Sequence, residues 1–142
     1  MRDVLEALAA GDISAAEAEA RLQGYVTGDA GRFDAARETR SGVPEAVLAD
    51  GKTPAEVAAL AATSLETTGR AIVTRADDKT REAVLDRLDA EHPEASLTGD
   101  ERSGVLVAHA PEFDRPSLDA RVGVVTAGTS DAIPAGEAAA VL

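Results

Sequence analysis

The stretch at residues 122–137 constrains the fold more than any other part of this sequence. It opens with a β-branched run at 122–126, which is typical of a buried parallel strand. Small and polar residues follow at 127–131, where glycine frees the backbone and serine or aspartate can cap a helix. A helix is predicted at 134–142, with proline and glutamate in its first turn. Strand, short turn and helix in this order are typical of the first βα unit of an open α/β sheet.

The turn itself is a predicted anion-binding loop. Amide groups at a helix start favour an anionic ligand, and open α/β sheets bind nucleotides at the carboxyl ends of their strands. The turn is only four residues long, so on its own it indicates a phosphate or nucleotide loop and no particular ligand. The residues concerned are Gly128, Thr129, Ser130 and Asp131.

The preceding chain alternates between predicted helices and strands. A helical hairpin is expected at 2–23, with a glycine between two short helices. A strand-helix-strand-helix unit of the βαβ type is expected at 46–91. Further strands at 95–98 and 103–109 extend this small domain to about residue 110. The predicted fold class is therefore α/β.

Residues 24–45 are rich in glycine and charge, which predicts an irregular loop before a strand at 46–49. Within this segment, charged side chains surround a Gly-x-Pro turn. Two arginines on a fixed turn predict either an anion clamp or an ion-pair lattice between domains, because guanidinium binds carboxylate or phosphate bidentately. The charged residues are Asp34, Arg37, Arg40 and Glu45.

Composition excludes several classes of function. The 26 acidic and 14 basic residues give a net charge of −12, which argues against nonspecific binding to nucleic acid or to an anionic membrane. The sequence has no cysteine, hence no disulfide, thiolate metal site or cysteine nucleophile of its own. No apolar run reaches membrane-spanning length and no signal-peptide pattern is present, so we expect a cytoplasmic protein. His92 and His109 lie in unrelated contexts and predict no metal site.

Two blocks of this sequence resemble the LarB family. Val-Val-Thr-Ala-Gly-Thr-Ser-Asp followed by Pro-Ala-x-Glu-Ala, at 124–138, resembles the opening of the PurE-like domain of that family. Asp-x-x-Arg-x-x-Arg-x-Gly-x-Pro-Glu, followed by Gly-Lys-Thr, is similar to its N-terminal signature and spans 34–53; Thr74 and Arg75 also fit. The Gly-Lys-Thr that contains Lys52 is not a Walker A motif, because the upstream glycine has the wrong spacing.

The resemblance implies a domain organisation. It places a LarB-type N-terminal domain at 1–110, a linker at 111–120 and the start of a PurE-like, flavodoxin-like parallel sheet at 121–142. Because only the first strand-turn-helix of that sheet is included, we expect a truncated product or fragment. The alternative is a complete small protein that retains the N-terminal domain alone.

The resemblance also implies an activity. LarB proteins carboxylate nicotinic acid adenine dinucleotide and hydrolyse it to pyridinium-3,5-biscarboxylic acid mononucleotide and AMP, in biosynthesis of the nickel-pincer nucleotide cofactor. Carbon dioxide or bicarbonate, Mg²⁺ and a homo-octamer belong to that family. Its nucleophile is a cysteine, which would lie outside this sequence, so this chain alone is expected to form no product.

The same resemblance assigns roles to residues. Gly128, Thr129, Ser130 and Asp131 would line the substrate site, with Ser130 holding phosphate and Asp131 taking ribose hydroxyls or magnesium. Contacts to an anion or between domains would come from Asp34, Arg37, Arg40, Glu45, Lys52 and Arg75. Two alternatives stay open: a non-catalytic α/β module for nucleotide binding or assembly, and a protein similar to aminoimidazole ribonucleotide carboxylase.

Overall fold

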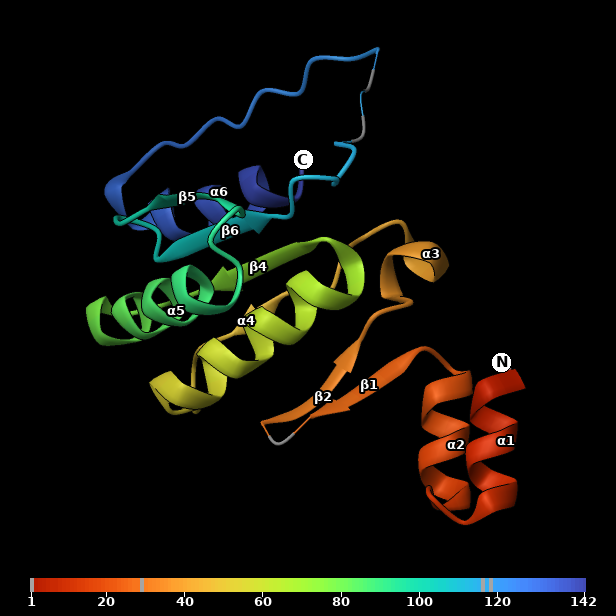
Figure 1. Cartoon of the computed structure of the whole chain (residues 1–142). Coiled ribbons are helices and arrows are strands. Elements are labelled where there is room, and N and C mark those ends of the chain that lie inside the picture. The colour runs from red at the N-terminus through yellow and green to blue at the C-terminus, as the bar shows by residue number, and fades with distance from the viewer. Residues whose placement is uncertain (1, 29, 116, 118) are drawn as a thin grey trace.

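The computed structural model describes residues 2–28, 30–115, 117 and 119–142. It is a mixed α/β fold, which confirms the predicted class (Figure 1). In chain order the elements are α1 (Arg2–Ala10), α2 (Ala15–Leu22), β1 (Tyr25–Gly28), β2 (Gly31–Asp34), α3 (Arg37–Ser41), β3 (Val47–Leu48), α4 (Pro54–Thr68), β4 (Arg70–Thr74), α5 (Asp78–Glu91), β5 (Ser96–Asp100), β6 (Val105–His109), a 3-10 turn (Thr129–Asp131) and α6 (Ala132–Val141).

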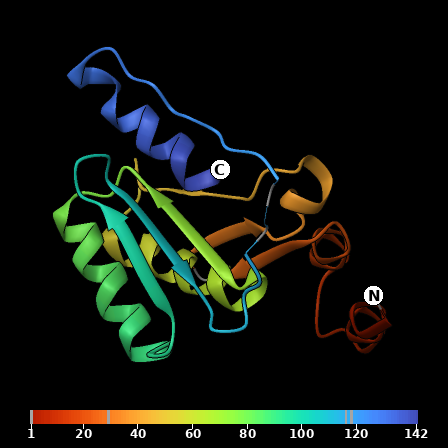
Figure 2. The same cartoon turned by 90° about the horizontal axis from the view of Figure 1, so that it is seen from above.

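The main sheet has the strand order β3-β4-β6-β5. β3 and β4 are parallel and are joined through α4, which is the predicted βαβ unit. β6 pairs antiparallel with both β4 and β5, so the sheet is mixed. α4 and α5 pack together over one face of the sheet, and α6 lies against β6 on the other side (Figures 1 and 2).

The long helices begin where the sequence supplies caps. Thr53 and Glu56 form a reciprocal capping box at the start of α4, and Gly69 ends that helix with a left-handed backbone, φ 74°. Asp77 accepts the Thr80 amide at the start of α5. Both helices then present their apolar residues to the sheet.

The core is built from small aliphatic side chains between the two helices and the sheet. Val57 and Ala61 of α4 and Val84 and Leu88 of α5 are at most 1% exposed. They pack on the face of β4 and β6 that carries Ala71, Val73, Leu106 and Ala108. Successive strand residues point to opposite faces, so Ile72 and Val105 are buried on the side of α6.

The predicted loop at 24–45 is wrong in part, because it contains regular structure. Residues 25–28 and 31–34 form an antiparallel hairpin, β1–β2, in which Val26 pairs with Phe33. The short helix α3 follows. The hairpin lies between the α1–α2 pair and α4, and Phe33 is only 3% exposed. The buried Phe33 gives the hairpin an apolar face. The glycines and charged residues around it predict a loop, so this face is not apparent from the sequence.

The predicted strand at 122–126 is also not formed. Residues 121–126 belong to no helix or strand in the part of the chain that the structure describes. The side chains of Val122, Val124 and Val125 are 59%, 45% and 94% exposed. A β-branched run becomes a buried strand only when neighbouring strands supply hydrogen bonds and cover its faces. All four strands of the main sheet come from residues 47–109, and none pairs with this segment.

Among the described residues, no helix is both long enough and apolar enough to cross a membrane.

Candidate functional site

A pocket of about 650 Å³ lies at the carboxyl ends of the parallel strands β3 and β4. This is the edge at which open α/β sheets bind their ligands. Residues from the end of β3, the end of β4, the β5–β6 turn and the start of α6 line it: Asp50, Arg75, Ala76, Asp77, Glu101, Arg102, Ser103, Gly104, Ser130, Ile133, Pro134 and Glu137.

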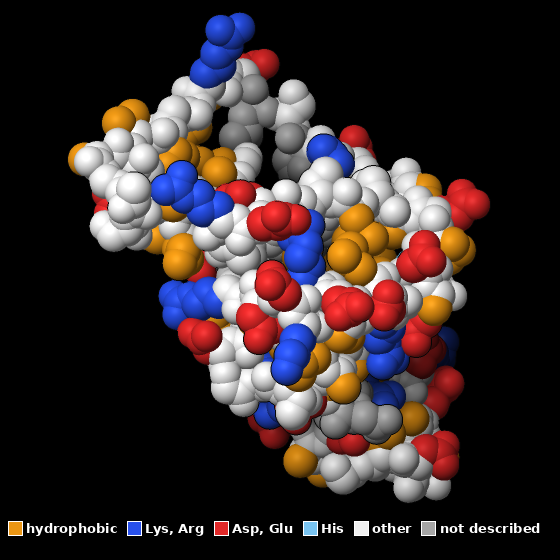
Figure 3. All heavy atoms as spheres, turned by 90° about the vertical axis from the view of Figure 1, so that its left-hand side faces the viewer, with side chains coloured by type: hydrophobic (Ala, Val, Ile, Leu, Met, Phe, Trp, Pro, Cys, Tyr) orange, Lys and Arg blue, Asp and Glu red, His pale blue; other side chains and the backbone are white. Residues whose placement is uncertain are grey.

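The pocket is charged. Figure 3 shows the molecule from the side that lies at the left in Figure 1, where β4 ends and α6 begins; acidic and basic side chains are interspersed over this face. The lining contains four carboxylates and two arginines. A purely anionic ligand would therefore need the arginines and amide groups to offset nearby acidic groups.

Arg75 is the central cation of this pocket. Its Nη1 donates to Asp50 Oδ2 over 3.1 Å, and its Nε donates to Glu137 Oε1 over 3.0 Å. These two hydrogen bonds, with the charge of Glu137, raise the pKa of the Arg75 guanidinium above its already high ordinary value. The side chain thus stays charged and links the end of β3 to α6.

The backbone at Arg75 is strained. Its φ of 56° lies in the left-handed region, and it is the one non-glycine residue with a positive φ in the described chain. Gly104 approaches it closely: a Cβ at Gly104 would lie 2.9 Å from the carbonyl oxygen of Ala76. The Ala76 amide donates to the Gly104 carbonyl over 2.9 Å. The β5–β6 turn is therefore held tightly against the end of β4.

Of the predicted anion loop, only Ser130 is among the residues that line this pocket; Gly128, Thr129 and Asp131 are not. Gly128 is extended, and the next three residues form the 3-10 turn that leads into α6. Ser130 lines the pocket, and its hydroxyl donates to Asp131 Oδ1 over 3.3 Å. Asp131 Oδ2 accepts the Ala127 amide over 3.4 Å. The Asp131 carboxylate thus stabilises the loop instead of capping α6 with its side chain.

Some of the loop amides already donate hydrogen bonds within the loop. The Asp131 amide donates to the Gly128 carbonyl over 3.3 Å, and the Ala132 amide donates to the Thr129 carbonyl. The Ser130 hydroxyl is therefore the loop group best placed to contact a ligand in the pocket.

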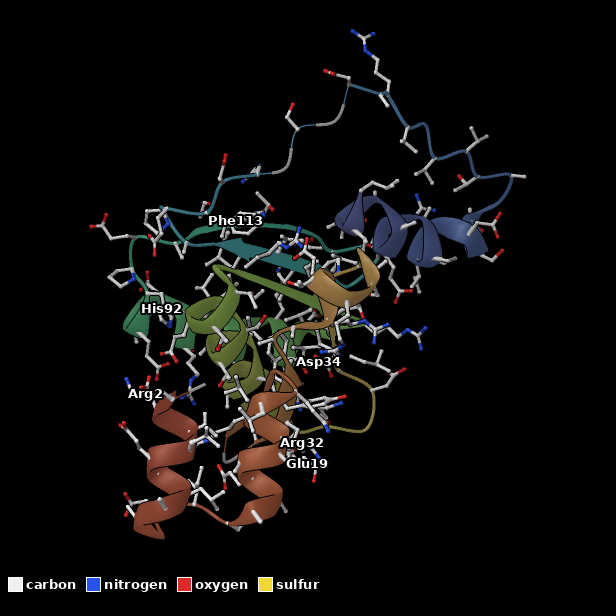
Figure 4. All side chains as sticks on the ribbon, turned by 90° about the vertical axis from the view of Figure 1, so that its right-hand side faces the viewer. Arg2, Glu19, Arg32, Asp34, His92 and Phe113 are labelled. Atoms are coloured by element: carbon white, nitrogen blue, oxygen red, sulfur yellow. The ribbon has the colours of Figure 1, made fainter. Side chains whose placement is uncertain are left out.

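The second predicted cluster lies elsewhere, around the β1–β2 hairpin and α3. Arg40 pairs with Asp34 and also donates to the Gln23 carbonyl over 3.0 Å. Arg37 pairs with Glu45 at 3.4 Å. In Figure 4, Asp34 lies close to α3. Each arginine is bound to a carboxylate, Asp34 of β2 or Glu45 of the loop before β3, which is the pattern of an ion-pair lattice and not of an open anion clamp.

Two further contacts extend this lattice. Arg70 of β4 pairs with Glu38 of α3 at 2.8 Å. The guanidinium groups of Arg32 and Arg40 lie 4.5 Å and 5.9 Å from the centroid of the Tyr25 ring. The first contact attaches α3 to the main sheet, and the second attaches α3 to the hairpin.

The structure thus separates the predicted site residues into groups. Ser130 and Arg75 line one pocket, whereas Lys52 donates to the Leu48 carbonyl over 2.8 Å and lines a different cavity with Glu45. Asp50 and Arg102 belong to the pocket but were missed from the sequence. For Asp50 a signal existed, because a carboxylate directly after a predicted parallel strand lies at the carboxyl edge of the sheet.

The fit of magnesium to these residues is limited. The described residues contain no group of three or more His, Asp or Glu side chains placed to hold a metal ion. Asp131 offers a single carboxylate, and Mg²⁺ in proteins is commonly held by one or two carboxylates together with substrate phosphates. A metal would therefore depend on ligands from the substrate.

The fold and the pocket define a small α/β domain with a charged pocket at the carboxyl edge of its parallel strands. A family model described as LarB/PurE-like N-terminal domain matches residues 25–107, and the chain belongs to that family. The match includes both hairpin strands, α3 and the main sheet up to Val107. No curated protein and no solved structure matches the chain.

Proposed function

We propose that this chain contributes to a LarB-type reaction, the carboxylation and hydrolysis of nicotinic acid adenine dinucleotide. One observation carries the proposal. Arg75, in the block that resembles the N-terminal signature, and Ser130, in the block that resembles the PurE-like opening, line the same pocket. Two segments that are 55 residues apart in the chain (130 − 75) thus meet at the edge where α/β folds bind nucleotides.

The chemistry of the pocket suits one part of that substrate. The Ser130 hydroxyl can donate to a phosphate oxygen if it rotates away from Asp131 Oδ1, and Arg102 adds a guanidinium to the lining of the same pocket. Arg75 is engaged with two carboxylates, so its role is to hold the site together. The family relationship supports a carboxylase. We propose that the reaction takes place in the cytoplasm.

A second candidate function is a non-catalytic nucleotide-binding or assembly module. The ion-pair lattice favours it, since Arg37, Arg40 and Arg70 all join elements of the fold to one another. Such a module would bind the dinucleotide, or a partner, without changing it.

Titration calorimetry with nicotinic acid adenine dinucleotide tests the proposal. A hydrogen bond to a charged group contributes about 1.5–3 kcal/mol, and about 1.4 kcal/mol corresponds to tenfold in affinity. Ser130→Ala should therefore weaken binding about tenfold or more, whereas Ser96→Ala, an exposed serine on β5 outside the pocket, should not. Equal affinity of the parent and Ser130→Ala, or no binding by the parent, would contradict the proposed site.

A further inference from the structure

α6 packs on the β5–β6 turn through a contact that only glycine permits. A Cβ atom built on Gly136 would overlap both Cβ and Oγ of Ser103. Ser103 itself is 2% exposed, and its hydroxyl donates to the Asp100 carbonyl over 3.3 Å. The backbone of α6 therefore rests directly on a buried side chain of the main domain.

The next residue of α6 makes the second contact. Glu137 accepts from Arg75 Nε over 3.0 Å, and the same guanidinium reaches Asp50. The side chain of Glu137 is only 25% exposed. Two adjacent residues of α6 thus contact the pocket lining: Gly136 contacts Ser103 of the β5–β6 turn, and Glu137 contacts Arg75 after β4.

The chain between the main sheet and α6 provides little other support. Within the described residues from 110 to 128, none lies in a helix or strand. The 3-10 turn that carries Ser130 runs directly into α6 without a break. The position of Ser130 at the pocket must therefore follow the position of α6.

We propose that Gly136 and Arg75 are positioning residues: they dock α6 on the N-terminal domain and thereby hold the Ser130 loop at the pocket. The consequence for ligand binding rests on the proposed function, but the docking itself does not. By this mechanism the N-terminal domain sets the geometry of a loop that lies outside its own sheet.

Hydrogen–deuterium exchange of the whole chain tests the docking. In Gly136→Ala the new methyl group must displace α6, so we expect amides of α6 and of the loop to exchange about tenfold or more faster. Alanine has a higher helix propensity than glycine, which alone would slow exchange, so the predicted sign cannot come from propensity. Amides of α4 and α5 should be unchanged, which shows that the core remains folded.

Two further variants make the test specific. Gly123→Ala, whose Cβ would meet nothing within 4 Å, is the matched control and should exchange like the parent. Ser103→Gly combined with Gly136→Ala removes both overlapping atoms and should restore slow exchange in α6. Arg75→Gln, which removes the ion pairs with Asp50 and Glu137, should also speed exchange in α6.

The outcomes separate this proposal from the proposed function. Unchanged exchange in Gly136→Ala, or failure of the double variant to restore it, would overturn the docking. Faster exchange with full dinucleotide affinity would overturn the positioning role. Faster exchange and rescue in a parent that binds no dinucleotide would support the docking and refute only the proposed function.

Discussion

At the scale of single residues, Arg37 and Arg40 differ in how deeply their carboxylate partners are buried. The partner of Arg40 is Asp34, whose side chain is 10% exposed, whereas Arg37 and Glu45 are 50% and 29% exposed. Asp34 Oδ1 is buried and has no hydrogen-bond partner within the described chain. Arg40 is therefore the main compensation for a nearly buried carboxylate.

This difference predicts unequal effects on stability. Arg40→Ala should lower the free energy of unfolding by about 1–3 kcal/mol, because it leaves a buried charged acceptor without its partner. Arg37→Ala should cost about 1 kcal/mol or less, as is usual for exposed ion pairs. Urea denaturation of both variants measures this, and equal losses would contradict the assignment.

His109 predicts a pH dependence. Burial, followed by the positive charges of Arg115 and Arg70, lowers the pKa of His109 below its ordinary value. The unfolded chain therefore binds this proton more readily than the folded chain. The free energy of unfolding should rise with pH across the interval from the lowered pKa of the folded state to about 6.5, the value of the unfolded state.

The contribution of His109 can be isolated. His109→Gln should flatten the change of unfolding free energy between pH 5 and 7 relative to the parent. Arg115→Gln removes one cause and should raise the pKa of His109, which NMR titration of the imidazole ring can follow. An unchanged pKa in Arg115→Gln would show that the 3.2 Å contact between Arg115 and His109 has no electrostatic effect.

At the scale of elements, α4 depends on its cap. Thr53 accepts the Glu56 amide over 3.3 Å, and Glu56 accepts the Thr53 amide over 2.7 Å. Thr53→Ala should lower the free energy of unfolding by about 1 kcal/mol. Thr67→Ala changes an exposed threonine near the other end of the same helix and should have little effect; thermal unfolding compares the two. A larger loss for Thr67→Ala would contradict the importance of the cap.

Elements with local signals were predictable from the sequence. The ends of α4 follow from Thr53 and Gly69, and the start of α5 follows from Asp77. The β1–β2 hairpin was missed because its order comes from Phe33 packing near α4, which is a tertiary contact. The strand at 122–126 was predicted wrongly because its β-branched residues require neighbouring strands, and a local pattern does not reveal whether these are present.

The same contrast holds for the site. Ser130 and Arg75 were each identifiable from local motifs, but their meeting at one pocket depends on the docking of α6. The Gly136–Ser103 contact has no signal in the sequence, since Gly136 resembles an unfavourable residue inside a helix.

At the scale of the whole molecule, the structure joins an N-terminal family domain to a short helix that carries the candidate loop. The family match ends at residue 107, and the loop that completes the pocket begins at Gly128. The pocket is thus shared between two parts of the chain, and its integrity depends on both.

Amide chemical shifts of the whole chain, recorded during titration with nicotinic acid adenine dinucleotide, test this most directly. We predict shifts at Gly128 and Ser130 together with Arg75 and Gly104, because all four lie at or beside one pocket. Shifts confined to the region around Tyr25 and Arg40, or no shifts at all, would contradict the assignment of this pocket as the ligand site.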